Sequence, residues 1–124
     1  MAVYYFTEKS TTPTARETKI IRGRGYVRGS FTAGDVIRVC PFPDNVTVLS
    51  ASVRVISPGQ AGETIELPNW GGSGLPVDAE GIVGGNWNPI YFENAGDIAI
   101  NAETALTNIW FEVDILVVKN ADGF

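Results

Sequence analysis

Apolar and polar residues alternate along two long stretches of the chain, and both stretches are predicted to be β-strands. In residues 46–56, one face is apolar and consists of Leu49, Ala51, Val53 and Val55. In residues 109–118, five apolar residues alternate with a polar face that holds Glu112 and Asp114. A period of two is typical of a strand with one buried face. The second of these strands is long and is expected to lie centrally in its sheet.

Glycine and proline divide the rest of the chain into shorter stretches rich in β-branched and aromatic residues, the usual composition of strands. Six further strands are predicted, at residues 20–22, 26–31, 35–40, 63–67, 90–92 and 97–100. Gly23-Arg24-Gly25 is interpreted as the turn between the first two. Pro41-Phe42-Pro43 is expected to end the third, because proline donates no hydrogen bond to a sheet. Residues 68–89 are dominated by Gly, Pro and Asn and are predicted to form a long loop, a kind of segment that is often functional.

Eight predicted strands, without a convincing helical pattern, favour two antiparallel sheets packed face to face. The expected fold is an all-β antiparallel β-sandwich, jelly-roll-like in its winding, with an immunoglobulin-like sandwich as the alternative. The 124 residues suit one domain. We place an extended N-terminal arm at residues 1–19, the β-sandwich domain at residues 20–120 and a short tail at residues 121–124. No membrane segment is expected, and the N-terminus does not have the pattern of a secretory signal.

The predicted arm begins with three consecutive aromatic residues, Tyr4, Tyr5 and Phe6. Large aromatic rings are costly to leave in water, so these side chains are predicted to pack against another surface. A frayed terminus without a role is the alternative. Trp110, on the polar face of the last strand, is predicted to be covered by this arm or by a neighbouring subunit.

Basic residues are concentrated at the beginning of the chain. Residues 1–38 hold seven of the nine Lys and Arg and carry a net charge of +4, whereas the remainder carries −9 and the whole chain −5. Arg22, Arg24 and Arg28 have even spacing, which places them on one face of an extended segment, and Arg16 adds a charge in the arm. This basic strip fits an acidic protein surface or phosphate. Alternatively, it is a solvated face that protects an edge strand. The acidic chain as a whole argues against a nucleic-acid partner.

The residue types needed for common catalytic and metal sites are missing. The chain has no histidine, which excludes Ser-His-Asp chemistry, Cys-His chemistry and His-bound zinc. Cys40 is the one cysteine and is predicted to be a small buried residue at a strand end. Asp78 and Glu80 offer too few oxygen ligands for calcium. Glu112 and Asp114 share a strand face but have no visible partner. We therefore expect a protein that is not an enzyme and that uses no metal and no cofactor.

Two tryptophans, Trp70 and Trp87, stand near the ends of the predicted long loop. Asn69, Asn86 and Asn88 lie beside them. Exposed aromatic rings with neighbouring amides are typical of a platform that stacks on sugar rings, so a glycan contact is one interpretation. Otherwise both indoles fold back to cap the sandwich or fill a contact between subunits.

One long stretch is similar to the sequences of small tailed-bacteriophage head proteins. Residues 34–67 have the sequence GDVIRVCPFPDNVTVLSASVRVISPGQAGETIEL, in which a Gly-Asp turn, a short strand and a proline-containing turn precede two alternating strands. Gly96-Asp97-Ile98 and a final strand over residues 111–115 complete the pattern. The chain resembles capsid decoration (cement) proteins and related small virion structural proteins over about half its length. Its tryptophan-rich middle departs from them.

This resemblance implies a non-enzymatic protein on the exterior of the virion. Such proteins bind the outer surface of an assembled phage capsid, commonly as homotrimers, and clamp neighbouring copies of the major capsid protein, which stabilises the shell. The arm would then add as a strand to a neighbouring subunit. The implied partner interface uses Tyr4, Tyr5, Phe6, Arg16, Arg22, Arg24 and Arg28. The alternatives are a head-fibre or tail component, and a carbohydrate-binding β-sandwich module that uses Trp70 and Trp87.

Overall fold

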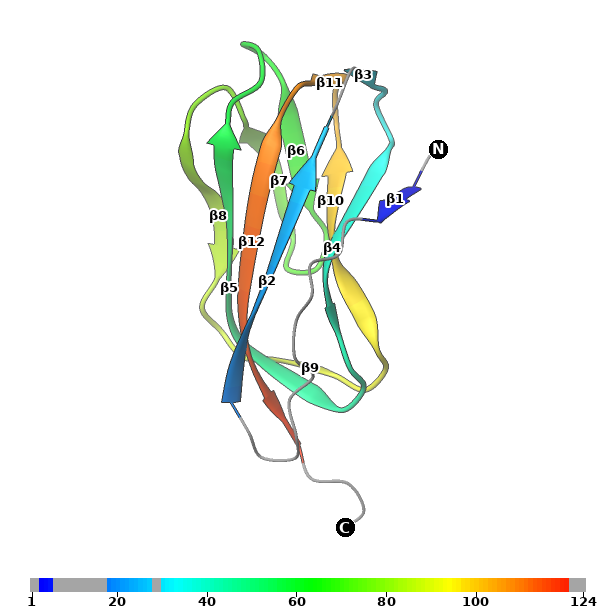
Figure 1. Ribbon diagram of the computed structural model, residues 1–124, viewed down its shortest axis with the longest axis vertical. Coiled ribbons are helices and arrows are strands. Elements are labelled where there is room, and N and C mark those ends of the chain that lie inside the picture. The colour runs from blue at the N-terminus through cyan, green and yellow to red at the C-terminus, as the bar shows by residue number, and fades with distance from the viewer. Residues whose placement is uncertain (1–2, 6–17, 28–29, 121–124) are drawn as a thin grey trace.

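Strands are the regular elements in the part of the chain that the structure describes. The computed structural model describes residues 3–5, 18–27 and 30–120 (Figure 1). The strands, in chain order, are β1 Val3–Tyr5, β2 Thr18–Tyr26, β3 Ser30–Phe31, β4 Val36–Phe42, β5 Val46–Ser57, β6 Thr64–Leu67, β7 Gly72–Pro76, β8 Gly81–Asn86, β9 Ile90–Phe92, β10 Gly96–Ala102, β11 Leu106–Thr107 and β12 Trp110–Lys119.

The strands form two main sheets that pack face to face (Figure 1). One sheet has the order β1-β4-β10-β6-β7, and the other has the order β2-β12-β5-β8, with β9 also paired to β5. A two-stranded ribbon joins β11 and β3. Neighbouring strands are antiparallel except β1 and β4, which run parallel. The predicted all-β antiparallel sandwich is therefore confirmed. The chain crosses repeatedly between the sheets, which is compatible with the expected jelly-roll winding.

The inward-facing side chains of the two sheets form one hydrophobic core. From β12 these are Phe111, Val113, Ile115 and Val117, each at most 1% exposed. They belong to one cluster with buried residues of the opposite sheet, which include Ile37, Val39, Ile65, Ile98 and Ile100. Full burial of such a side chain contributes roughly 1.5–3 kcal/mol. This core explains why the alternation along residues 109–118 predicted its strand correctly.

Strand β2 runs unbroken through Gly23-Arg24-Gly25, so the predicted turn at this tripeptide is wrong. Gly23 and Gly25 pair with Val113 and Phe111 of β12 in the ladder. A Cβ atom at Gly23 would lie 2.7 Å from the backbone nitrogen of Cys40 in β4. Gly23 therefore allows β2 and β4, which belong to opposite sheets, to lie close together, and it does not mark a turn of the chain.

Cys40 forms a β-bulge in β4. The register with β10 changes from Asp97↔Pro41 to Ile98↔Val39, so Cys40 is the extra residue, and its φ angle is +52°. Its side chain is fully buried, as predicted. The bulge also explains why β4 continues through Pro41, which was expected to end it: proline is tolerated where a ladder is locally disrupted.

The segment predicted as a long loop, residues 68–89, contains two strands, and that prediction is wrong. Strand β7 pairs with β6, and β8 pairs with β5. Leu75 and Val83 pack against the core, and a Cβ atom at Gly84 would lie 2.7 Å from a methyl group of Leu67. Strands β7 and β8 therefore form by pairing with β6 and β5, although their glycine-rich sequences have no strand-like pattern.

A second bulge corrects the expected inward face of β5. Leu116 pairs with Ser50 whereas Val117 pairs with Val48, so Leu49 is the extra residue. Val48 is 2% exposed and replaces Leu49 among the fully inward side chains. Ala51, Val53 and Val55 point inward as predicted.

The N-terminal residues contribute to both sheets. Val3–Tyr5 pair in parallel with residues 36–38 of β4, and β2 begins at Thr18. Residues 6–17 of the predicted arm and the predicted tail at residues 121–124 lie outside the described residues, and the boundaries of arm, sandwich and tail remain predictions. The described part of the chain contains no helix that could cross a membrane.

Candidate functional site

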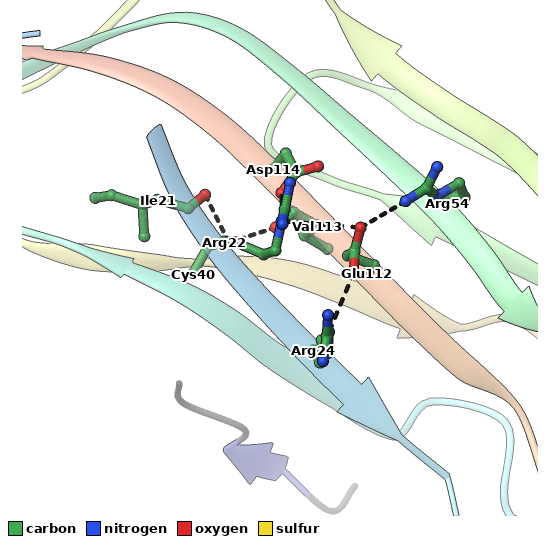
Figure 2. Close-up of polar contacts among 8 residues, drawn as sticks. All are labelled: Ile21, Arg22, Arg24, Cys40, Arg54, Glu112, Val113 and Asp114. Carbon is green, nitrogen blue, oxygen red and sulfur yellow. Dashed lines mark hydrogen bonds and ion pairs between the residues drawn. The ribbon is translucent and has the colours of Figure 1, made fainter. Parts of the chain in front are cut away.

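Charged residues of opposite sign face one another on the outer face of the β2-β12-β5 sheet. Arg22 and Arg24 of β2 stand opposite Asp114 and Glu112 of β12 in the ladder. On the other side of β12, Arg54 of β5 stands opposite Glu112. Glu112 therefore lies between arginines from both neighbouring strands (Figure 2), whereas Asp114 faces an arginine, Arg22, on the β2 side alone. We call these five residues the ion-pair ladder.

Glu112 is the centre of the ion-pair ladder. Its side chain is only 5% exposed. One carboxylate oxygen, Oε1, accepts a hydrogen bond from Arg54 Nη2 at 2.6 Å, and the other, Oε2, accepts one from Arg24 Nε at 3.1 Å (Figure 2). Arg22 Nε donates to Asp114 Oδ1 at 2.7 Å and lies 3.8 Å from Glu112 Oε1. Bonds to both oxygens satisfy a carboxylate that would otherwise be costly to bury.

The arginines determine the charge state of Glu112. Burial alone would raise the pKa of this carboxyl group. The hydrogen bonds from Arg54 and Arg24, together with the charges of Arg22 and Arg54, outweigh burial and hold the pKa of Glu112 below its usual value. The group is therefore ionised at neutral pH, which makes it a poor proton donor. The geometry supports a structural role for Glu112.

Aromatic side chains continue the outer face beyond Arg24. The rings of Trp110 and Tyr26 meet edge to face, with centroids 6.0 Å apart and an interplanar angle of 84°. The Arg24 guanidinium lies 6.0 Å from the centroid of the Trp110 ring, within reach of a cation–π contact. Trp110 remains 36% exposed. Its expected cover by the arm or by another subunit stays a prediction.

A shallow pocket of about 250 Å³ lies beyond Arg22, in the other direction along the same face. Arg22 and Asp114 belong to both the ion-pair ladder and the pocket. The other lining residues are Ile20, Ser50, Ala51, Ser52, Trp87, Ile115 and Leu116. Ile20 and Trp87 are 68% and 67% exposed, the highest values among the large hydrophobic residues that the structure describes. We call this feature the Trp87 pocket.

The structure brings together three of the predicted site residues, Arg22, Arg24 and Trp87, on one sheet face. Trp70 is separate from them: it follows β6 in the other sheet and packs, half-buried, against the core.

Other predicted contact residues are described only in part or not at all. Tyr4 and Tyr5 belong to β1, of which the structure describes the backbone pairing. Phe6, Arg16 and Arg28 lie outside the described residues. Within the described ranges, no three His, Cys, Asp or Glu residues are grouped so that they could hold a metal ion.

The partners of the arginines were not predicted from the sequence. Glu112 and Asp114 were recognised on one face of a strand, but Arg54 was not connected with them. All three occupy outward positions of the two most regular strands. If those strands are assumed to be neighbours, their alternation places Arg54 beside Glu112. The Trp87 pocket had no such signal, because its residues come from four separate segments.

Comparison with known proteins gives a likeness in structure. No family model matches the sequence, and no curated protein matches it. A chain in the solved structure "Capsid of Ralstonia phage GP4" superimposes with a TM-score of 0.66 at 16% sequence identity. The match covers 91% of this chain and 93% of that chain. At this identity the likeness shows a shared fold, and it extends over nearly the whole length of both chains.

Proposed function

We propose that this chain is a non-enzymatic structural protein of a phage virion that binds the outer surface of the assembled capsid and stabilises the shell. The observation that carries the proposal is the shared fold with a chain from the capsid of Ralstonia phage GP4, over nearly the full length of both. The resemblance of residues 34–67 to small phage head proteins supports the same conclusion independently of the superposition.

The proposed partner is the major capsid protein, and the proposed assembly is a homotrimer on the capsid exterior. A shell presents many equivalent sites, so each copy needs only modest affinity if three linked copies bind at once. Stabilisation follows because a protein that binds only the assembled form favours that form by mass action.

The proposed contact comes mainly from the N-terminal arm, through Tyr4, Tyr5, Phe6 and Arg16. Its first residues pair with an edge of a sheet in their own chain, which supports the idea that such a segment adds as a strand. Arg22, Arg24 and Arg28 are the proposed basic contribution. Because Arg22 and Arg24 bond to two carboxylates in the ion-pair ladder, their long-range attraction for an acidic capsid surface is reduced.

The proposal is tested by mixing the full chain with empty shells assembled from the phage's major capsid protein. We expect the chain to sediment with the shells but not to bind unassembled major capsid protein. Electron microscopy should then show extra density repeated over the outer surface. Density at one vertex or on the tail would instead favour the head-fibre or tail alternative, and absence from the particles would overturn the proposal.

The contact residues are tested separately. Replacing Tyr4, Tyr5 and Phe6 together by Ser should reduce the fraction of protein that sediments with shells, because the arm loses its apolar contacts. Ile82→Ser is the matched control, since it removes an exposed apolar side chain from the sandwich itself, away from the proposed contact residues. Equal sedimentation of the arm variant and the unchanged protein would remove the arm from the proposed interface.

A further inference from the structure

We propose that the Trp87 pocket binds one neutral sugar ring of a glycan. This site is additional to the proposed attachment to a capsid, with which it shares Arg22 alone. The pocket combines an exposed indole, apolar side chains and hydroxyl, carboxylate and guanidinium groups within one small hollow. Sugar rings have apolar C–H faces and polar hydroxyl edges, so they need both kinds of group at once.

Contacts with neighbouring residues restrict the Trp87 side chain, although it is 67% exposed. Its ring lies over Gly85: a Cβ atom there would be 2.7 Å from Cη2 of the indole and 2.6 Å from the carbonyl oxygen of Ala51. The two flanking residues are joined by a pair of hydrogen bonds. Asn86 Nδ2 donates to the backbone carbonyl of Asn88 at 2.6 Å, and the backbone N–H of Asn88 donates to Asn86 Oδ1 at 3.3 Å. A preorganised aromatic ring loses little conformational freedom on binding. The indole can therefore stack on a ligand at low entropic cost.

The polar groups of the pocket match the needs of sugar hydroxyls. Ser50 and Ser52 present hydroxyl groups that both donate and accept, and within the described part of the chain neither side chain has a hydrogen-bond partner. Asp114 uses Oδ1 for Arg22 Nε, and its second oxygen has no partner among the same residues. A sugar hydroxyl that donates to the second oxygen of Asp114 and accepts from Ser50 or Ser52 would give both protein groups a hydrogen-bond partner. Apolar contact comes from Ile20 and Leu116 at the side of the hollow.

Charge and size favour a neutral sugar over other small ligands. The pocket contains one arginine and one carboxylate, which pair at 2.7 Å, so it has no excess positive charge for a phosphate. Asp114 would also repel any anion placed beside Arg22. The volume of about 250 Å³ is below the ~300–1,000 Å³ that is usual for drug-sized ligands, which suits a single ring.

The test uses the full chain without capsid, so its outcome does not depend on the proposed capsid attachment. A broad array of neutral and acidic oligosaccharides is screened, and positive oligosaccharides are measured in solution by saturation-transfer NMR and calorimetry. We expect binding to a subset of neutral glycans. Trp87→Ala should weaken the affinity at least about 30-fold, the effect typical of an aromatic group central to an interface. Ser50→Ala with Ser52→Ala should weaken it by a smaller factor.

Trp110→Ala is the matched control, because it removes an indole from the same sheet face outside the pocket. We expect it to leave glycan affinity unchanged. Circular dichroism and thermal unfolding show whether each variant is folded. Because Trp87 is largely exposed, we expect Trp87→Ala to fold normally. The proposal is overturned if the unchanged protein binds no glycan on the array, if it binds acidic glycans alone, or if Trp87→Ala and Trp110→Ala have equal effects. Self-association that buries Trp87 and blocks every glycan would also overturn it.

Discussion

The two faces of β12 are stabilised in different ways. The inward face places Phe111, Val113 and Ile115 in a core that excludes water, and its stability depends on shape and volume. The outward face places Glu112 between arginines of two strands, and those arginines are 43–52% exposed. The inward contacts are therefore expected to dominate the free energy of unfolding. The outward contacts connect three neighbouring strands through their side chains and make part of the stability depend on pH.

The largest effect is expected from the inward face. Phe111→Ala should reduce the free energy of unfolding by about 3–5 kcal/mol, because it leaves a cavity in a fully packed core. Urea unfolding followed by circular dichroism measures this loss. The neighbouring Trp110→Ala removes an even larger ring from the outward face and should cost much less. Equal losses would show that the two faces contribute alike.

A close approach on the inward side of β2 should be the next most sensitive position. Gly23→Ala is expected to cost up to about 3 kcal/mol, because its Cβ atom would meet the backbone of Cys40, which has little room to move. Gly72→Ala is the control: there the nearest atom, at 3.3 Å, ends a flexible Leu75 side chain. Chemical denaturation of the two variants gives the comparison. A Gly23→Ala variant as stable as Gly72→Ala would mean that β2 and β4 can separate without cost.

On the outward face, Glu112→Gln should reduce the free energy of unfolding by about 1–2 kcal/mol. Loss of a buried, paired charge usually costs more, but the half-exposed arginines regain water when the carboxylate is removed. Asp114→Asn is the control and should cost less than about 1 kcal/mol, since Asp114 is more exposed and has one arginine partner. Urea midpoints of both variants test the order, and a larger loss in Asp114→Asn would contradict it.

The smallest expected effect is a change with pH. The pKa of Glu112 in the folded protein is held below its usual value of 4.5. The stabilisation that its charge gives the folded state is therefore fully present above about pH 4.5, and it is lost as the pH falls through the lower pKa of the folded state. The stability difference between the unchanged protein and Glu112→Gln should therefore shrink from about pH 6 to about pH 3. Urea unfolding across this range measures it. A constant difference would show that the charge of Glu112 contributes nothing.

The fold could be predicted where side-chain alternation is regular, as in residues 109–118 and most of 46–56. It could not be predicted where backbone pairing alone makes a strand. Strands β7 and β8 contain glycines with no pattern, and they form because β5 and β6 offer unpaired edges. Gly23 resembled a turn residue, although its role is to let two sheets approach. The bulge at Leu49 also left no mark in the sequence.

The candidate site could be predicted only in part, because it depends on which strands are neighbours. Even spacing correctly placed Arg22 and Arg24 on one face. The same reasoning could not show that these arginines lie beside Glu112 and Asp114, because the pairing of β2 with β12 joins residues far apart in the chain. Trp87 was one of two candidates for a sugar-stacking ring, with a folded-back indole as the alternative, and its neighbours Ser50 and Ser52 belong to another strand.

The buried thiol of Cys40 gives this protein a built-in reporter of its own motions. Its Sγ atom lies 3.0 Å from the carbonyl oxygen of Val113 and 3.6 Å from that of Ile21, both in the opposite sheet, and its exposed fraction is 0% (Figure 2). A water-soluble disulfide reagent reaches it only when the two layers part. Because the chain has no other cysteine, the labelling rate of the unaltered protein measures how often this opening occurs, whether the chain is free or attached to a larger particle.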